Sequence, residues 1–322
     1  MSRYLILLFK IGLSAALVWY VFSKIDTASA FDYLRSIPIY ILAGAIILLL
    51  LQQFIAGLRL RELLSLLDAP CRIITAVDVV LIGVFFSQTF ISFIGGDVMR
   101  IWRITRSNVP VGIAAKAVLF DRVVGFVSLL LVIILTLPFA LGIINDPHMR
   151  SSLYLLIGAG IAATVVFMTM DRLPESLHRW RLFRVAADIS SIALDIARSR
   201  QSAVTVLGYS LAIQVLNVVI LYVVSRGLDM EISFVSALVL IPPVLLIAML
   251  PISVAGWGVR EGAMIVALAL VGVHSAQSLA LSICFGLLLI TLSLPGGVIW
   301  FLTRHQTTPE AASDSDSANQ RA

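Results

Sequence analysis

The sequence predicts an all-α polytopic membrane protein. Of its 322 residues, 60% are hydrophobic and 13% carry a formal charge, whereas about 25% are charged in a typical soluble domain. The mean hydropathy is +1.04. A helix needs about 20 apolar residues to cross a bilayer, so this length allows about 6–8 transmembrane helices. We expect one integral-membrane domain over residues 1–302 and a disordered polar C-terminal tail over residues 303–322.

Six apolar runs have the composition of spanning helices. They cover Tyr4–Phe22, Ile39–Ile55, Ile113–Leu137, Leu153–Met170, Ala203–Val224 and Leu279–Leu302. The first follows Arg3 and precedes Ala28-Ser29-Ala30, a small-residue pattern that also occurs where signal peptides are cleaved. Because Lys10 interrupts this run and a long polar gap precedes Ala30, a retained span is preferred over a cleaved signal.

Two further apolar segments contain polar residues or prolines. They are Ile74–Ile94, with Asp78 and Gln88, and Phe234–Leu250, which is followed by Ala263–Val273. Such content is typical of helices that break or turn back inside the membrane. The sequence therefore predicts re-entrant or broken helices near residues 74–97 and 240–262.

The distribution of arginine supports a turn in the first of these segments. Three connections are basic, at residues 59–72, 100–106 and 172–200, and basic connections face the cytoplasm. A complete crossing by residues 74–94 would place the first two on opposite sides, although such a span remains the alternative. Counting the predicted spans in both directions from these cytoplasmic connections places both termini in the cytoplasm.

One connection also has a helical pattern of its own. Residues 182–193 place apolar side chains at three- and four-residue spacing, which predicts an amphipathic helix. It lies either on the lipid surface or against neighbouring spans as a linker.

Composition also excludes several classes of function. The formal net charge is +5, but no basic stripe with interleaved aromatic residues occurs, so nucleic acid is not an expected partner. Cys71 and Cys284 lack metal-ligand spacing and the four histidines are scattered, so we expect neither a metal nor a disulfide framework. Without a phosphate loop, nucleophile elbow or zinc-binding histidine pair, we expect no cofactor and favour a protein that is not an enzyme.

Two stretches, residues 91–100 and 251–261, place glycines and opposite charges inside the apolar chain. Laid over each other, they align Ser92 with Ser253 and Gly95 with Gly256. This is a weak internal repeat, for which chance is the alternative. Glycine permits sharp turns and close backbone approach, and free amides at the start of the next helix can face an anionic group.

The charged residues of these stretches are the candidates for binding. Arg100, Arg103 and Arg260 can bind phosphate, while Asp97 and Glu261 keep the cations paired in the empty site. Pairing without any ligand is the alternative. The candidate site comprises Ser92, Gly95, Gly96, Asp97, Arg100, Arg103, Asp121, Arg122, Ser253, Gly256, Gly258, Arg260 and Glu261.

Two charged segments beside the spans allow two interpretations each. Asp121 can pair locally with Lys116 or Arg122, or reach inward toward Arg100 if the helix start is buried. Arg59-Leu60-Arg61-Glu62 follows the second span, and an interfacial position is preferred there because long side chains snorkel to the head groups.

Three motifs carry a family resemblance. Gly95-Gly96-Asp97-Val98-Met99-Arg100, Asp121-Arg122-Val123-Val124-Gly125 and the stretch from Pro251 to Gly262 resemble the transmembrane region of lysylphosphatidylglycerol synthases and their stand-alone flippase-like relatives. The resemblance covers residues 5–302. Family members often carry a proline shortly before Gly-Gly-Asp, where this chain has Phe90-Ile91-Ser92-Phe93. The full-length synthases also carry a soluble aminoacyl-transfer domain that this chain lacks, so aminoacylation is not expected.

The resemblance implies a lipid-handling protein of the bacterial inner membrane. The leading hypothesis is a translocase for an anionic or modified phospholipid. The alternatives are an intramembrane transferase with Asp97 or Asp121 as base, and an accessory or scaffold subunit in lipid or envelope glycolipid synthesis. The expected partners are a phospholipid or other anionic lipid, the membrane and a lipid-synthesis enzyme, and a homo-oligomer remains open.

Overall fold

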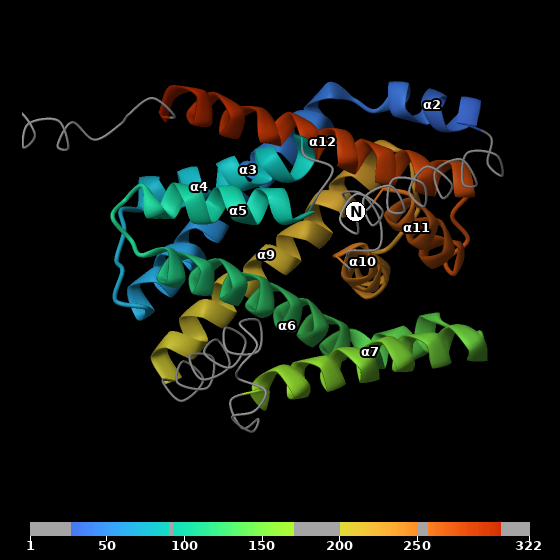
Figure 1. Ribbon diagram of the computed structural model, residues 1–322. Coiled ribbons are helices and arrows are strands. Elements are labelled where there is room, and N and C mark those ends of the chain that lie inside the picture. The colour runs from blue at the N-terminus through green and yellow to red at the C-terminus, as the bar shows by residue number, and fades with distance from the viewer. Residues whose placement is uncertain (1–26, 90–92, 171–199, 250–256, 304–322) are drawn as a thin grey trace, which may run out of the picture.

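The computed structural model describes residues 27–89, 93–170, 200–249 and 257–303 (Figure 1). These residues form helices and contain no strand, which confirms the predicted all-α class. The helices are α2 (Thr27–Ser36), α3 (Ile39–Leu66), α4 (Ile73–Thr89), α5 (Phe93–Thr105), α6 (Val111–Ile143), α7 (Pro147–Met168), α9 (Arg200–Gly227), α10 (Phe234–Met249), α11 (Val259–Ala269) and α12 (Ser275–Thr303).

Five of the described helices are long and apolar enough to cross a membrane, namely α3, α6, α7, α9 and α12. Each overlaps one predicted span. Helix α6 has 33 residues, about 50 Å at about 1.5 Å per residue, so it must tilt in, or extend beyond, a hydrocarbon core of about 30 Å. The predicted span at residues 4–22, the amphipathic segment at 182–193 and the tail from residue 304 lie outside the described residues.

The corner between α6 and α7 is fixed by local hydrogen bonds. The Asp146 carboxylate accepts hydrogen bonds from the backbone N–H groups of His148 and Met149, at 2.7 and 3.2 Å. The Arg150 guanidinium donates to the carbonyl groups of Leu141 and Ile144 at the end of α6. Polar groups that a helix end leaves without partners are thereby satisfied on both sides of the corner.

Helices α4 and α5 form an antiparallel hairpin. Asp78 pairs with Arg103 near its open end at 3.3 Å, and Gly83 lies against the side chain of Arg100. The helices have 17 and 13 residues, about 26 and 20 Å, which is less than a bilayer core of about 30 Å. The chain returns to the side from which it came, and insertion of the hairpin into the membrane stays a prediction.

The glycines of the first motif do not form the turn that the sequence predicts. Gly95 and Gly96 lie inside α5, which begins at Phe93. A Cβ atom on Gly96 would lie 2.5 Å from the carbonyl oxygen of Gly83 and would also overlap Ser87. Gly96 is thus required because the two helices of the hairpin pack closely there.

Helices α10 and α11 are a second pair of short neighbours, with 16 and 11 residues. Two prolines, Pro242 and Pro243, lie inside α10, and Gly258 precedes α11 with a φ of +85°, a value that favours glycine. Helix α12 packs against α4 and against α11, so it contacts one helix of each pair (Figure 1).

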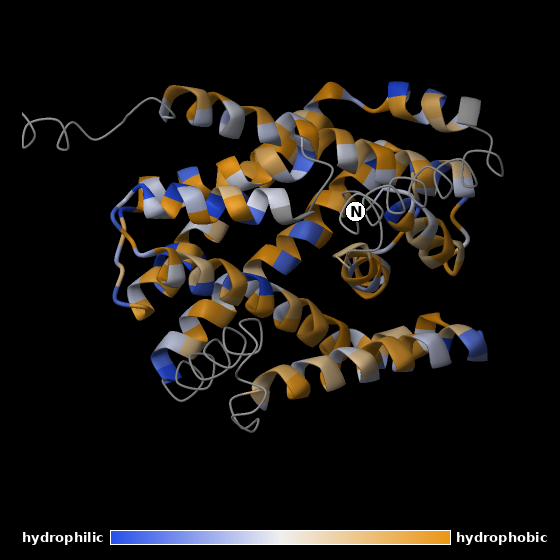
Figure 2. Cartoon of the chain, in the orientation of Figure 1, coloured by the Kyte–Doolittle hydropathy of each residue, from blue (hydrophilic) through white to orange (hydrophobic). Residues whose placement is uncertain are grey.

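The core runs between the long helices, and the outer surface is also apolar. Buried side chains from α3, α6, α9, α10 and α12 form the largest cluster, which includes Leu49, Ile133 and Leu221. Many apolar side chains are exposed, among them Leu155 and Leu302, and hydrophobic residues predominate along the long helices (Figure 2). An exposed apolar surface of this extent is expected where lipid rather than water surrounds the protein.

The short helix α2 was not predicted from the sequence. It packs along α12, where Ala30 is buried against Leu279 and Ile283. Its ten residues are too few and too polar to have the pattern of a span.

Candidate functional site

A buried group of charges joins three helices in the interior of the bundle. Asp121 on α6 accepts a hydrogen bond from Nε of Arg59 on α3 at 2.8 Å. Its second carboxylate oxygen accepts from Nη1 of Arg100 on α5 at 3.2 Å. The side chains of Arg59, Arg100 and Asp121 are only 8%, 13% and 7% exposed.

A second ion pair lies one residue along α6. Arg122 donates to both oxygens of Asp97 on α5, with its shortest contact at 2.9 Å. This planar two-bond geometry suits arginine with a carboxylate and equally with a phosphate. The side chains are 27% and 18% exposed, more than those of the inner group. We refer to Arg59, Asp97, Arg100, Asp121 and Arg122 together as the central charge cluster.

Among the residues that the structure describes, the central charge cluster contains three guanidinium groups and two carboxylates, an excess of one positive charge. A charged side chain at the centre of a bilayer costs about 2.5–3.5 kcal/mol even on the mildest scale. Charged residues inside a membrane segment are candidates for a functional site, and an anionic ligand would neutralise an excess of positive charge.

Three helices bring polar residues to this interior at helical spacing. They are Gln52 and Arg59 on α3, Asp121 and Ser128 on α6, and Ser210, Gln214 and Asn217 on α9. On α6, the backbone carbonyl of Gly125 lies between Asp121 and Ser128 along the chain. Residues three, four or seven apart lie on one face of a helix, so each helix presents a polar stripe.

The stripes are connected by hydrogen bonds. Gln214 donates to the carbonyl of Gly125 at 3.1 Å and to Ser128 at 3.3 Å. Asn217 donates to Gln214 at 3.1 Å, and Gln52 donates to Asn217 at 2.7 Å. The network extends the polar interior from the central charge cluster along α9, and each contact offsets the cost of burying these groups.

The second glycine motif builds a separate and more closed arrangement. Arg260 donates from Nη2 to Glu261 at 2.8 Å and from Nε to Ser282 on α12 at 3.0 Å. Glu261 also accepts from Ser282 at 3.0 Å and from the backbone N–H of Gly258. The guanidinium lies 5.1 Å from the ring centre of Trp257. These contacts tie the start of α11 to α12.

The predicted partners of the candidate residues are partly confirmed. Asp121 reaches inward to Arg100, as one interpretation of the sequence has it, and Glu261 pairs with Arg260. Asp97 does not pair with Arg100 or Arg103: it pairs with Arg122, because α5 presents Asp97 to α6.

Other candidate residues lie apart from the central charge cluster. Arg103 pairs with Asp78 inside the first hairpin, and its Nε is buried without a hydrogen-bond partner among the described residues. Ser92, Ser253 and Gly256 lie outside the described residues.

The preferred interpretation, in which the Arg59 side chain snorkels outward, is wrong, because that side chain is buried in the protein. Helix α3 continues to Leu66, eleven residues beyond the predicted end of the span, and carries Arg59 into the interior. Arg59 also donates to Ser210 on α9 at 3.2 Å. The signals that could have revealed this site are the seven-residue spacing of Gln52 and Arg59 and the helical spacing of the polar residues of α9.

No group of three or more histidine, cysteine, aspartate or glutamate side chains that could hold a metal ion occurs in the described part of the chain.

A family model described as the lysylphosphatidylglycerol synthase TM region matches residues 7–296. The chain belongs to this family. All three motifs that carry the resemblance lie within the matched residues. Membership and the apolar helices together establish a multi-pass membrane protein from a lipid-related family. No curated protein and no solved structure matches the chain.

Proposed function

We propose that the protein binds the head group of an anionic phospholipid at the central charge cluster and moves it between the two leaflets. The observation that carries the proposal is that the central charge cluster has three guanidinium groups and two carboxylates among the described residues. A phosphate group supplies the missing negative charge, and the acyl chains remain in the bilayer. Membership of a lipid-related family supports a lipid as the source of that phosphate.

The two ion pairs of the cluster have different roles in this mechanism. Asp97 and Arg122 form its more exposed pair, so a head group meets Arg122 first and competes with Asp97 for its guanidinium. Arg59, Arg100 and Asp121 lie deeper and provide the positive charge that draws the phosphate inward.

Arg260 has a positioning role in this proposal, in place of the phosphate-binding role predicted from the sequence. Arg260 is 5% exposed, and its guanidinium already has Glu261, Ser282 and an aromatic ring as partners. Displacing these partners would leave Glu261 buried without its counter-charge, which is costly.

The orientation follows from the basic connections. We place the protein in a bacterial inner membrane with the connections after α3 and α5 in the cytoplasm, since both carry arginine. The hairpin of α4 and α5 then re-enters the membrane from the cytoplasmic side.

The test is lipid translocation in liposomes that contain the purified protein and a trace of phosphatidylglycerol with a fluorescent head group. An outside-only quencher should reach more than the outer-leaflet share of label with the wild-type protein. The variant Arg100→Gln, which removes the excess charge, should reduce this to the level of empty liposomes. The control Arg226→Gln removes an exposed arginine at the end of α9 and should leave the activity unchanged.

Two outcomes would contradict the proposal. Equal translocation by Arg100→Gln and wild type would exclude the central charge cluster as the head-group site. No difference between wild type and empty liposomes, with anionic, zwitterionic and cationic head groups, would favour the transferase or scaffold alternatives. Product formation by the purified protein would then separate those two.

A further inference from the structure

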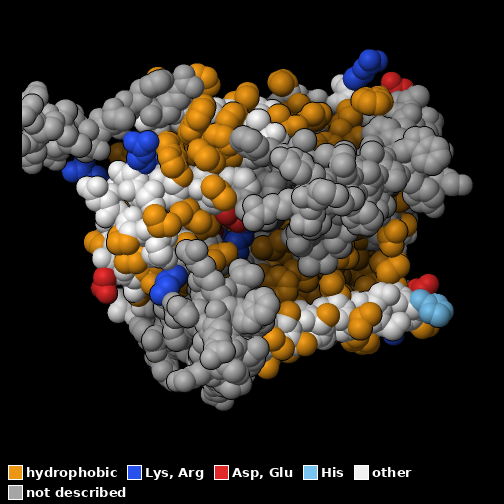
Figure 3. All heavy atoms as spheres, in the orientation of Figure 1, with side chains coloured by type: hydrophobic (Ala, Val, Ile, Leu, Met, Phe, Trp, Pro, Cys, Tyr) orange, Lys and Arg blue, Asp and Glu red, His pale blue; other side chains and the backbone are white. Residues whose placement is uncertain are grey.

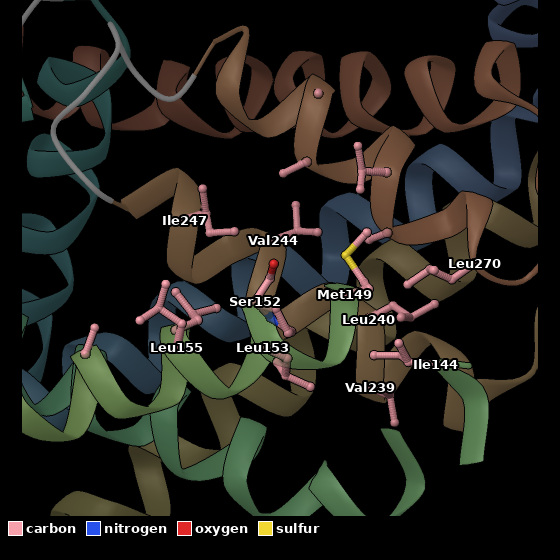
Figure 4. A pocket seen from close by; sticks show the side chains of 17 residues that line it. Ile144, Met149, Ser152, Leu153, Leu155, Val239, Leu240, Val244, Ile247 and Leu270 are labelled. Carbon is pink, nitrogen blue, oxygen red and sulfur yellow. The ribbon is translucent and has the colours of Figure 1, made fainter. Parts of the chain in front are cut away.

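An apolar hollow of about 480 Å³ lies between α7, α10 and α11. Figure 3 shows it as an open recess lined with hydrophobic side chains above α7. Figure 4 shows side chains of α7, such as Met149 and Leu155, facing those of α10, such as Val244. Among the described residues that line it, Ser152 contributes the one polar side chain.

The hollow exists because α7 packs chiefly on α6 rather than on α10 or α11. Gly160 of α7 lies against Leu130 of α6, and Arg150 closes the corner between the two helices. Helix α10 packs on α6, α9 and α11. As a result, apolar side chains that line the hollow stay exposed, and Leu155 is 73% exposed.

The length of the hollow matches one leaflet. Its lining on α7 extends from Met149 to Ala159, which is about 15 Å at about 1.5 Å per residue. This is half of a hydrocarbon core of about 30 Å. An acyl chain of one leaflet has the same extent and the same apolar surface.

The hollow lies in the leaflet opposite the basic connections. Helix α6 starts after the connection that follows α5 and reaches Arg122 in its first half. It passes Leu130, level with Gly160, and ends at Ile143 beside the far end of the hollow. The inner end of the hollow is therefore about 12 Å further along α6 than Arg122, from the rise of about 1.5 Å per residue.

We infer that the hollow binds an acyl chain of a phospholipid in the leaflet opposite the basic connections. The inference rests on the proposed function, since it names where the lipid is held on one side of its passage. The acyl-chain site therefore lies in one leaflet only, the one that contains the corner between α6 and α7.

Photolabelling tests this inference. The protein is placed in nanodiscs of phosphatidylethanolamine and phosphatidylglycerol with a trace of phosphatidylglycerol that carries a diazirine near the end of one acyl chain. After illumination, labelled residues are mapped by mass spectrometry. Surrounding lipid labels every exposed apolar surface, so the reference is Leu287 and Ile290, which are exposed on α12. We expect several-fold more label on Leu155 and Val266, which line the hollow and are exposed, than on this reference.

Two glycine variants provide a matched pair. A Cβ atom on Gly262, which lines the hollow, meets nothing within 4 Å, so Gly262→Phe fills the hollow without a clash at Cβ. A Cβ atom on Gly158 of α7 also meets nothing within 4 Å, and Gly158 does not line the hollow. Gly262→Phe should remove the excess label from Leu155 and Val266, whereas Gly158→Phe should retain it.

Three outcomes would overturn the inference. They are equal labelling of the hollow and of α12, excess label that survives Gly262→Phe, and a hollow that stays unlabelled in the wild type. The last would indicate another occupant, such as residues 4–22 of this chain or a second copy.

Failure of this inference is distinguishable from failure of the proposed function. Labelling requires only equilibrium binding, so Arg100→Gln should retain the excess label even as it loses translocation. A labelled hollow in a protein that does not translocate lipid would preserve the acyl-chain site and exclude the translocase.

Discussion

The excess charge of the central charge cluster predicts an asymmetry between two conservative variants. Asp121→Asn leaves Arg59 and Arg100 buried without their shared carboxylate, which contacts them at 2.8 and 3.2 Å. Removing one partner of a buried ion pair costs about 3–5 kcal/mol. Arg100→Gln loses the 3.2 Å contact but leaves Asp121 paired with Arg59 and removes the excess charge. Its cost should stay within about 1 kcal/mol, the net value of an ordinary hydrogen bond.

The free energy of unfolding is measured by titrating the protein in mixed detergent micelles with a denaturing detergent. The thiol of Cys284 is buried in α12, so in a Cys71→Ser background its reaction with a fluorogenic maleimide reports the loss of structure. Equal costs for Asp121→Asn and Arg100→Gln would refute the excess-charge argument. A cost for Asp121→Asn below about 1 kcal/mol would contradict the buried pairing itself.

Two further predictions concern the first hairpin and the connection before it. Gly96→Ala should destabilise the protein by about 1–3 kcal/mol through overpacking against the Gly83 carbonyl. The control Gly112→Ala adds a Cβ that meets nothing within 4 Å, so it should be neutral or stabilise the protein by up to about 1 kcal/mol. Equal effects of the two variants in the same detergent titration would contradict the close packing at Gly96. Burial raises the pKa of the Cys71 thiol, against the opposing field of Arg61, so a membrane-impermeant maleimide should label it slowly at neutral pH and faster as the pH rises toward that pKa. Labelling should occur only in inside-out vesicles, and labelling in right-side-out vesicles would reverse the proposed orientation.

Most of the fold could be predicted from hydropathy. A long apolar run in lipid folds as a helix, because a helix forms all of its backbone hydrogen bonds within the segment. The apolar runs within the described residues correspond to helices. Helix ends were less predictable: α3 passes its last apolar run by eleven residues because Arg59 finds partners inside. A hydropathy profile assigns arginine to the interface, and only the tertiary partners reverse that assignment.

The candidate site could be predicted as a set of residues but not as a set of pairs. Asp97, Arg100, Asp121 and Arg122 do meet, since charges inside an apolar chain must find one another. Which carboxylate meets which guanidinium depends on how α5 and α6 rotate about their axes, and no local pattern fixes that rotation. The contribution of α9 was missed because Ser210 and Gln214 are uncharged.

The two glycine motifs have similar composition but differ in what their charges hold together. Arg260 and Glu261 are adjacent, and apart from each other their partners include Ser282 on α12 and two residues just before α11, Trp257 and Gly258. In the first motif, Arg100 reaches 21 residues along the chain to Asp121, which is also held by Arg59 from 62 residues away. Separating α5 from α6 therefore breaks the ion pairs of the first motif, Arg100 with Asp121 and Asp97 with Arg122. The ion pair of Arg260 with Glu261 lies within α11 and is not affected by that movement. An anionic group that replaces Asp97 at Arg122 could offset part of this cost, so we expect the hairpin of α4 and α5 to be the element that moves.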